Sequence, residues 1–90
     1  MERWMIIQDD RNDEQILSHP FLVIATDTFM SGWGLAEGGV SYMAWACREE
    51  DVQRAIEKLK ARKEMRRVRV VYGSYRPKGK GHCHVYVFNP

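Results

Sequence analysis

The stretch Phe21-Leu22-Val23-Ile24-Ala25-Thr26 (FLVIAT) decides the predicted fold class, because it is almost entirely apolar and rich in residues that favour β-strands. Such continuous apolar runs are typical of strands inside a sheet whose two faces are both covered. We therefore predict a strand deep in a sheet, with both faces covered or one face weakly exposed. Pro20 stands directly before this strand and ends any helix that precedes it.

Two shorter elements are predicted upstream of this strand. Trp4 to Gln8 is typical of a short edge strand. Residues 9–15 (DDRNDEQ) are polar, and they predict a loop or the first turn of a short helix that continues through Ile16 and Leu17. The acidic run has neither the central glycine nor the distal glutamate of an EF-hand calcium loop, so a solvated turn is the expectation.

A second strand is predicted from Val40 to Cys47. Its side chains alternate between two faces, with small and large residues interleaved. The preceding segment, residues 31–39 (SGWGLAEGG), is rich in glycine and is expected to connect the two strands. It does not fit a dinucleotide-binding fingerprint, because the glycine spacing is one residue too long and a strand rather than a helix follows.

The clearest helix signal begins at Glu49 and continues to about Lys63. Acidic residues occupy its first turn and basic residues its last, as the helix dipole favours. An apolar stripe with helical spacing marks the face that packs on the sheet, and it consists of Val52, Ala55, Ile56 and Leu59.

The C-terminal third predicts two strands, residues 66–72 and 81–88, because polar and apolar residues alternate in both. The eight residues between them, 73–80, favour a hairpin. Residues 1–90 are then expected to form a single α+β domain. Its predicted core is a four-stranded antiparallel sheet with one amphipathic helix on one face, in the order β-β-α-β-β, after a short N-terminal appendage.

Length and composition limit the class of protein. Ninety residues accommodate one small core, and no apolar run reaches the roughly 20 residues of a membrane span, so a soluble protein without membrane contact is expected. The N-terminus turns acidic at Asp9 and lacks the layout of a secretory signal, which makes a cytoplasmic location the default. In that compartment Cys47 and Cys83 are expected to be reduced thiols.

Charge is strongly segregated along the chain. Residues 1–53 carry three basic and ten acidic side chains, a balance of −7, whereas residues 54–90 carry eleven basic and two acidic side chains, a balance of +9. The C-terminal part is therefore suited to nucleic acid or an acidic protein surface, unless the acidic part folds across it. A solvated charged surface is the alternative interpretation.

The stretch 76–84 (RPKGKGHCH) combines charge, glycine, imidazole and thiol. His82 and His84 share one face of the predicted strand, but a metal site needs a third ligand, for which only His19 or Cys47 is available. The spacing from Gly73 fails the Walker pattern. No nucleophile, base and carboxylate are arranged as a catalytic constellation, so neither a cofactor nor an enzymatic activity is predicted.

Nucleic-acid binding is the function that this C-terminal region favours. Paired as a hairpin, its two strands would place arginines beside rings, with lysines at the tip, a mixture typical of surfaces that bind single strands. The predicted contact residues are Arg67, Arg69, Arg76, Lys78, Lys80, His84, Tyr86 and Phe88. The alternative is that Tyr86 and Phe88 pack under the N-terminal segment or at the interface of a homodimer.

Residues 29–52 (FMSGWGLAEGGVSYMAWACREEDV) and 67–88 (RVRVVYGSYRPKGKGHCHVYVF) resemble small uncharacterised proteins of tailed phages and prophages of Gram-negative bacteria. The resemblance covers residues 20–88 and brings no established activity with it. It implies a protein that acts in the cytoplasm of a bacterial host. Small phage proteins commonly bind nucleic acid, or bind and disable a host protein, including components of CRISPR and other defence systems.

These observations predict a non-enzymatic binding module that contacts nucleic acid or a nucleoprotein through the basic C-terminal hairpin. The alternative is an inhibitor or adaptor that docks on a host protein, such as an anti-CRISPR protein. It would use the glycine-rich loop around Trp33, the acidic N-terminal segment or an open sheet face. Homodimerisation is compatible with either function, because an uncovered edge strand invites pairing.

Overall fold

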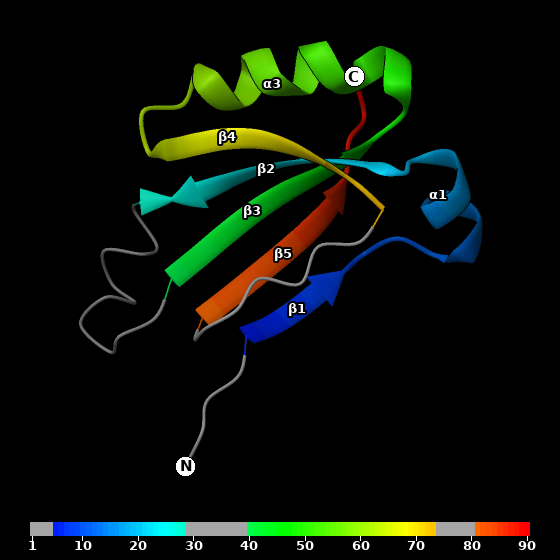
Figure 1. Ribbon diagram of the computed structural model, residues 1–90, viewed down its shortest axis with the longest axis horizontal. Coiled ribbons are helices and arrows are strands. Elements are labelled where there is room, and N and C mark those ends of the chain that lie inside the picture. The colour runs from blue at the N-terminus through cyan, green and yellow to red at the C-terminus, as the bar shows by residue number, and fades with distance from the viewer. Residues whose placement is uncertain (1–4, 29–39, 74–80) are drawn as a thin grey trace.

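Five strands form one mixed sheet in the computed structural model, which describes residues 5–28, 40–73 and 81–90. The order of the strands across the sheet is β1-β5-β3-β2-β4 (Figure 1). The elements, in chain order, are β1 (Met5–Asp9), α1 (Asp13–Ser18), β2 (Phe21–Asp27), β3 (Val40–Cys47), the short 3-10 helix η1 (Glu49–Asp51), α3 (Val52–Lys60), β4 (Met65–Tyr72) and β5 (Gly81–Val87).

The prediction of a four-stranded antiparallel sheet is wrong. Only β3, β2 and β4 are joined by antiparallel pairing, whereas β5 runs parallel to both of its neighbours, β3 and β1. The predicted N-terminal appendage contributes the fifth strand, β1, at the edge of the sheet. The sequence pattern missed this arrangement because alternation assigns residues to faces of a sheet but does not say which strands are neighbours.

The predicted hairpin between the last two strands is also wrong. Two strands, β3 and β2, lie between β5 and β4, which run in the same direction. β4 and β5 are therefore not hydrogen-bonded neighbours, as a hairpin would require. A connection of eight residues is compatible with a hairpin by length alone, and this made the simpler pairing the natural prediction.

The strand predicted from FLVIAT is confirmed as an interior strand. Leu22, Val23, Ile24 and Ala25 are all buried, and β2 is hydrogen-bonded to β3 on one side and to β4 on the other. Successive side chains belong to different clusters, since Val23 and Ala25 pack beneath α3 whereas Leu22 and Ile24 pack on the opposite face. Both faces of this strand are therefore covered.

The predicted helix is confirmed with shorter bounds. Glu49–Asp51 forms a 3-10 turn, and the α-helix proper begins at Val52 and ends at Lys60. Its apolar stripe packs on the sheet as expected, with Ala55 and Leu59 fully buried. The helix lies over β4, β2 and part of β3 rather than over the whole sheet (Figure 1).

The two cysteines lie on opposite faces of the sheet. Cys47 belongs to the cluster beneath α3, and Cys83 belongs to the cluster on the other face. Both are buried free thiols, and the sheet between them excludes a disulfide that joins them. The cluster around Cys83 is flanked by Met5 and Ile7 of β1, so this strand helps to bury it.

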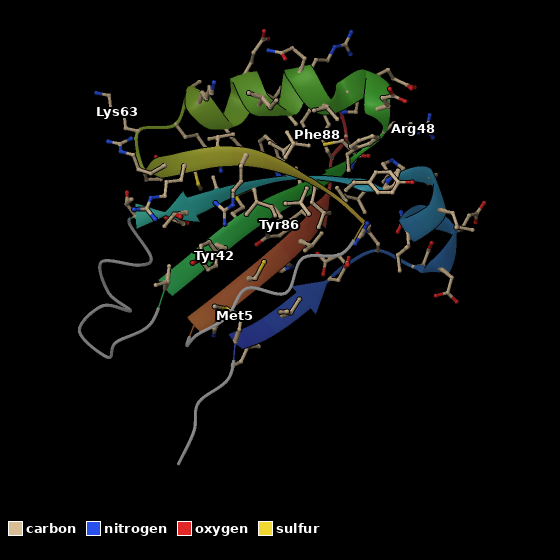
Figure 2. The ribbon with its side chains drawn as sticks, viewed as in Figure 1. Met5, Tyr42, Arg48, Lys63, Tyr86 and Phe88 are labelled. Carbon is tan, nitrogen blue, oxygen red and sulfur yellow. The ribbon has the colours of Figure 1, made fainter. Side chains whose placement is uncertain are left out.

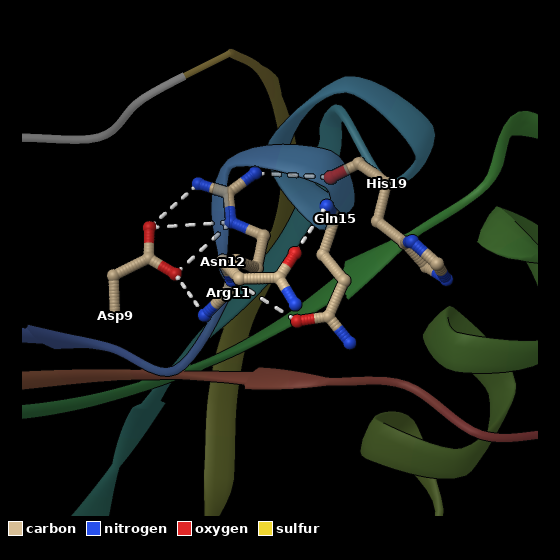
Figure 3. Close-up of polar contacts among 5 residues, drawn as sticks. All are labelled: Asp9, Arg11, Asn12, Gln15 and His19. Atoms are coloured by element: carbon tan, nitrogen blue, oxygen red, sulfur yellow. Dashed lines mark hydrogen bonds and ion pairs between the residues drawn. The ribbon is translucent and has the colours of Figure 1, made fainter.

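Arg11 fixes the path of the chain where it leaves β1 (Figure 3). Its guanidinium donates to both carboxylate oxygens of Asp9, with Nη2 2.7 Å from Oδ2, and Nη1 donates to the carbonyl oxygen of His19 at 2.9 Å. The Arg11 side chain is almost completely buried. Asn12 and Gln15 form a reciprocal capping box at the start of α1.

Burial of Asp9 raises its pKa, but the hydrogen bonds and the positive charge of Arg11 outweigh this effect and hold the pKa below its ordinary value of 3.8. The pair therefore remains ionised at neutral pH and joins the end of β1 to the start of β2. Among the described residues, neither α1 nor α3 has the length and apolar composition needed to cross a bilayer.

Candidate functional site

The structure separates the residues that the sequence predicted to act together. Arg67 and Arg69 lie on β4, at one edge of the sheet, whereas His84 and Tyr86 lie on β5, three strand positions away. At a spacing of about 4.8 Å between strands, this separates the two sets by about 14 Å. The predicted surface of β4 arginines beside β5 rings therefore does not form. Arg76, Lys78 and Lys80 lie outside the described residues.

Phe88 belongs to the core and is not available to a base. It is only 5% exposed and packs against Trp45, with 5.1 Å between the ring centroids. Figure 2 shows its ring beneath α3, where the ammonium of Lys58 lies 5.2 Å from the ring centroid. The alternation that placed Phe88 on the face of Tyr86 was correct, but the helix covers this end of the face.

His84 and Tyr86 form a stacked pair on the face of the sheet that also carries α3. Their ring centroids are 3.8 Å apart and the planes meet at 16°. Residues two apart on a strand share a face, so the strand itself brings the rings together. Tyr86 is 39% exposed, because α3 lies mainly over β4, β2 and β3. The pair therefore presents aromatic surface to solvent.

The carboxylate of Asp10 holds the imidazole of His84. Asp10 Oδ2 lies 2.9 Å from His84 Nε2, and because a carboxylate only accepts, Nε2 is the donor. The backbone N–H of Asp10 also donates to the carbonyl oxygen of Val85 at 3.0 Å, which fixes Asp10 beside β5. Sequence analysis missed this contact, because 74 positions separate the two residues and only the parallel pairing of β1 with β5 brings them together.

On the side of the ring pair that faces β1, another polar side chain lies near Asp10. In the parallel register, Gln8 lies opposite His84, and Met43 of β3 lies opposite His84 on the other side. Gln8 and His82 are exposed. The stacked rings thus lie between an edge strand that bears an amide and a carboxylate and an interior strand that bears apolar groups.

Two cations, Lys58 of α3 and Arg62 of the turn that follows it, border the other side of the pair. Lys58 lies over Phe88, and the guanidinium of Arg62 lies 5.7 Å from the ring centroid of Trp45 and 3.5 Å from the sulfur of Met43. The contacts of Arg62 place it beside the pair, because Met43 and Trp45 of β3 lie opposite His84 and Tyr86 in the register. We call this whole surface the β5 face; it comprises Gln8, Asp10, Lys58, Arg62, His82, His84 and Tyr86.

The β4 arginines have a different environment. Arg66 donates to the carbonyl oxygens of Lys63 and Met65, and Arg69 donates to that of Arg67 at 3.0 Å. The Arg69 guanidinium also lies 5.5 Å from the ring centroid of Tyr42. Arg67 has a φ of 55° where the register between β2 and β4 shifts. A charged, irregular edge of this kind discourages pairing with another strand.

The thiols are unsuited to nucleophilic chemistry. Burial, together with the nearby charge of Asp51, raises the pKa of Cys47 to about 11. Burial also raises the pKa of Cys83, although the charge of Arg69 opposes this effect. Within residues 5–28, 40–73 and 81–90, no three potential metal-ligating side chains converge, and Cys83 points away from the two histidines that flank it.

The described residues define a small α+β domain with a mixed sheet, one half of which lies beneath α3 while the other presents a ring pair between cations and carboxylate. Comparison of the chain with protein-family models, with curated proteins and with solved structures finds no match. Inference about function therefore starts from the chemistry of the site.

Proposed function

We propose that the protein is a non-enzymatic module that binds single-stranded nucleic acid on the β5 face. The observation that carries this proposal is the exposed stack of His84 and Tyr86, bordered by Lys58 and Arg62. Aromatic rings accept bases of any sequence, and neighbouring cations neutralise phosphates. The proposal replaces the predicted hairpin surface but keeps two of its rings and its class of ligand.

Shape favours a single strand over a duplex. A base can add to the stack of His84 and Tyr86 only if it is unpaired, because the bases of a duplex are already stacked on one another. Lys58 and Arg62 lie at the margin of the rings, where the backbone of a strand whose bases lie on the sheet would run. Segregation of positive charge into residues 54–90 adds a general attraction for polyanions.

Fluorescence anisotropy of labelled oligonucleotides, titrated at several salt concentrations, tests this proposal. We expect single strands to bind more tightly than duplexes, and we expect binding to weaken as salt rises, because phosphate contacts release counterions. The charge-reversing pair Lys58→Glu and Arg62→Glu should reduce the affinity at least 10-fold, which corresponds to about 1.4 kcal/mol.

The matched control is the pair Lys60→Glu and Lys63→Glu, which makes the same change in net charge on α3 and the turn that follows it. Lys60 lies two positions from both Lys58 and Arg62, on a different side of the helix. Equal loss of affinity in the two double variants would show that the effect depends on net charge alone, and it would contradict a specific binding site on the β5 face. Absence of single-strand binding at low salt would refute the function.

A protein partner is the second candidate, and exposed apolar side chains of α1 and β4 favour it. Leu17 of α1 is 84% exposed, and Tyr72 of β4 is 71% exposed although its ring contacts Phe21 edge-on, with 5.1 Å between centroids. Exposed apolar surface marks protein contacts. A nuclease-treated pull-down supports an inhibitor or adaptor if a stoichiometric partner is retained by the wild type and lost by Leu17→Ser with Tyr72→Ser.

A further inference from the structure

The two sides of the His84 and Tyr86 pair carry opposite charge. On the α3 side lie Lys58 and Arg62, and on the β1 side lies the Asp10 carboxylate, which is 41% exposed. This inference rests on the proposed binding of single strands. The separation of charge then orients the bound strand, with its phosphates towards α3 and the edges of its bases towards β1. The Asp10 carboxylate, which would repel a phosphate, is then placed where it can accept hydrogen bonds from a base.

The contact with His84 places the Asp10 carboxylate beside a stacked base. A ring N–H lies in the plane of its ring, so the carboxylate that accepts from His84 Nε2 at 2.9 Å lies at the edge of the imidazole. A base stacked on this ring lies parallel to it at van der Waals distance. Its edge therefore comes next to the same carboxylate, which keeps acceptor capacity on both oxygens.

Among the common bases, guanine matches this acceptor best. Its Watson–Crick edge presents two adjacent donors, N1–H and the N2 amino group, which face the two oxygens of one carboxylate. Cytosine and adenine present one amino group beside a ring nitrogen that accepts, and uracil and thymine present one N–H between two carbonyl oxygens. Acceptors on those edges repel a carboxylate, and hydrogen bonds to charged groups are the stronger class.

We propose that Asp10 gives the β5 face a preference for an unpaired guanine. The proposal rests on the proposed function and names the base that the site selects. A good bidentate contact discriminates between bases by about 1–3 kcal/mol, so the lower bound of the expected preference is about 5-fold. The preference requires a single strand, because pairing in a duplex occupies the same edge of guanine.

The test compares labelled oligothymidine decamers with one central guanine, inosine, adenine or cytosine. Wild-type protein should bind the guanine decamer about 5-fold or more tightly than the adenine, cytosine and all-thymine decamers. Inosine lacks the N2 amino group, and we expect it to bind less tightly than guanine. This comparison uses the natural protein and depends on no variant.

Asp10→Asn then tests the assignment to this residue. The variant should equalise the guanine and adenine decamers, and it should bind the all-thymine decamer more tightly than the wild type does, because one negative charge that repels phosphate is removed. Equal binding of all decamers by the wild type, or a guanine preference that survives in Asp10→Asn, would overturn the inference but leave the proposed function standing. No binding of any decamer would overturn both.

Discussion

The face of the sheet that carries α3 has a covered half, which lies beneath the helix, and an open half, which lies beside it. Phe88 belongs to the covered half and Tyr86 to the open half. The two residues are two positions apart at the end of β5 and share a face, yet Phe88 is 5% exposed beneath α3 and Tyr86 is 39% exposed beside it. The period of the strand puts both aromatic residues on the same face. The part of that face that the short helix covers then decides which ring stabilises the fold and which ring is available to a ligand.

The largest effect is expected from Phe88→Ala, in the covered half. Truncation of a buried aromatic side chain costs about 3–5 kcal/mol, a large part of the stability of a small domain. Phe88 also contacts Trp45, so the cavity would open between the sheet and α3. Denaturant unfolding monitored by tryptophan fluorescence measures the loss, and a change below about 1 kcal/mol would contradict the burial assigned to this ring.

A smaller effect, of about 1–3 kcal/mol at neutral pH, is expected from Arg11→Met. Its removal leaves the partly exposed Asp9 carboxylate and the His19 carbonyl oxygen without their donor. Because Asp10 follows Asp9, loosening of this corner should also reduce the preference of the β5 face for the guanine decamer. Denaturant unfolding and oligonucleotide titration of the same variant measure both effects.

The pH dependence of stability checks the same contact. The pKa of Asp9 is lower in the folded protein than its ordinary value of 3.8, so its contribution is complete above that value and is lost as pH falls through the folded pKa. Wild-type stability should therefore decline more steeply than that of Arg11→Met as pH falls below about 4. Parallel declines in the two proteins would contradict the contribution of this pair.

The smallest effect on stability is expected from Tyr86→Ala, in the open half. Loss of a partly exposed ring should cost less than about 1 kcal/mol, whereas the affinity for a single strand should fall about 5- to 100-fold, because stacking contributes about 1–3 kcal/mol per base. The contrast with Phe88→Ala sharpens the comparison of the two halves. A Tyr86→Ala variant that loses stability but not affinity would place this ring in the core as well.

Much of the fold could be predicted from local pattern. The interior strand at FLVIAT, the strand from Val40 to Cys47 and the apolar stripe of α3 each depend on residues close in sequence, and the structure confirms all three. The position of β5 could not be predicted in this way. Its alternation is equally compatible with pairing to β4 or to β3, and only packing of the whole sheet selects between them.

The candidate site depends on that non-local choice. His84 and Tyr86 were predicted from their spacing, but the groups that border them come from β1 and α3 rather than from β4. Asp10 was assigned to a solvated turn and Arg62 to the last turn of a helix, because nothing in their local sequence links them to residues near the C-terminus.

The measurement that tests the central claim most directly is a ¹H–¹⁵N spectrum of the labelled protein, titrated with an unlabelled oligothymidine decamer that contains one guanine. The account predicts that shifted amides cluster at Asp10, at His84 to Tyr86, and around Lys58 and Arg62 at the end of α3 and in the turn that follows it. The β4 amides around Arg67 and Arg69 should stay in place. Shifts confined to β4, or no shifts at all, would contradict it.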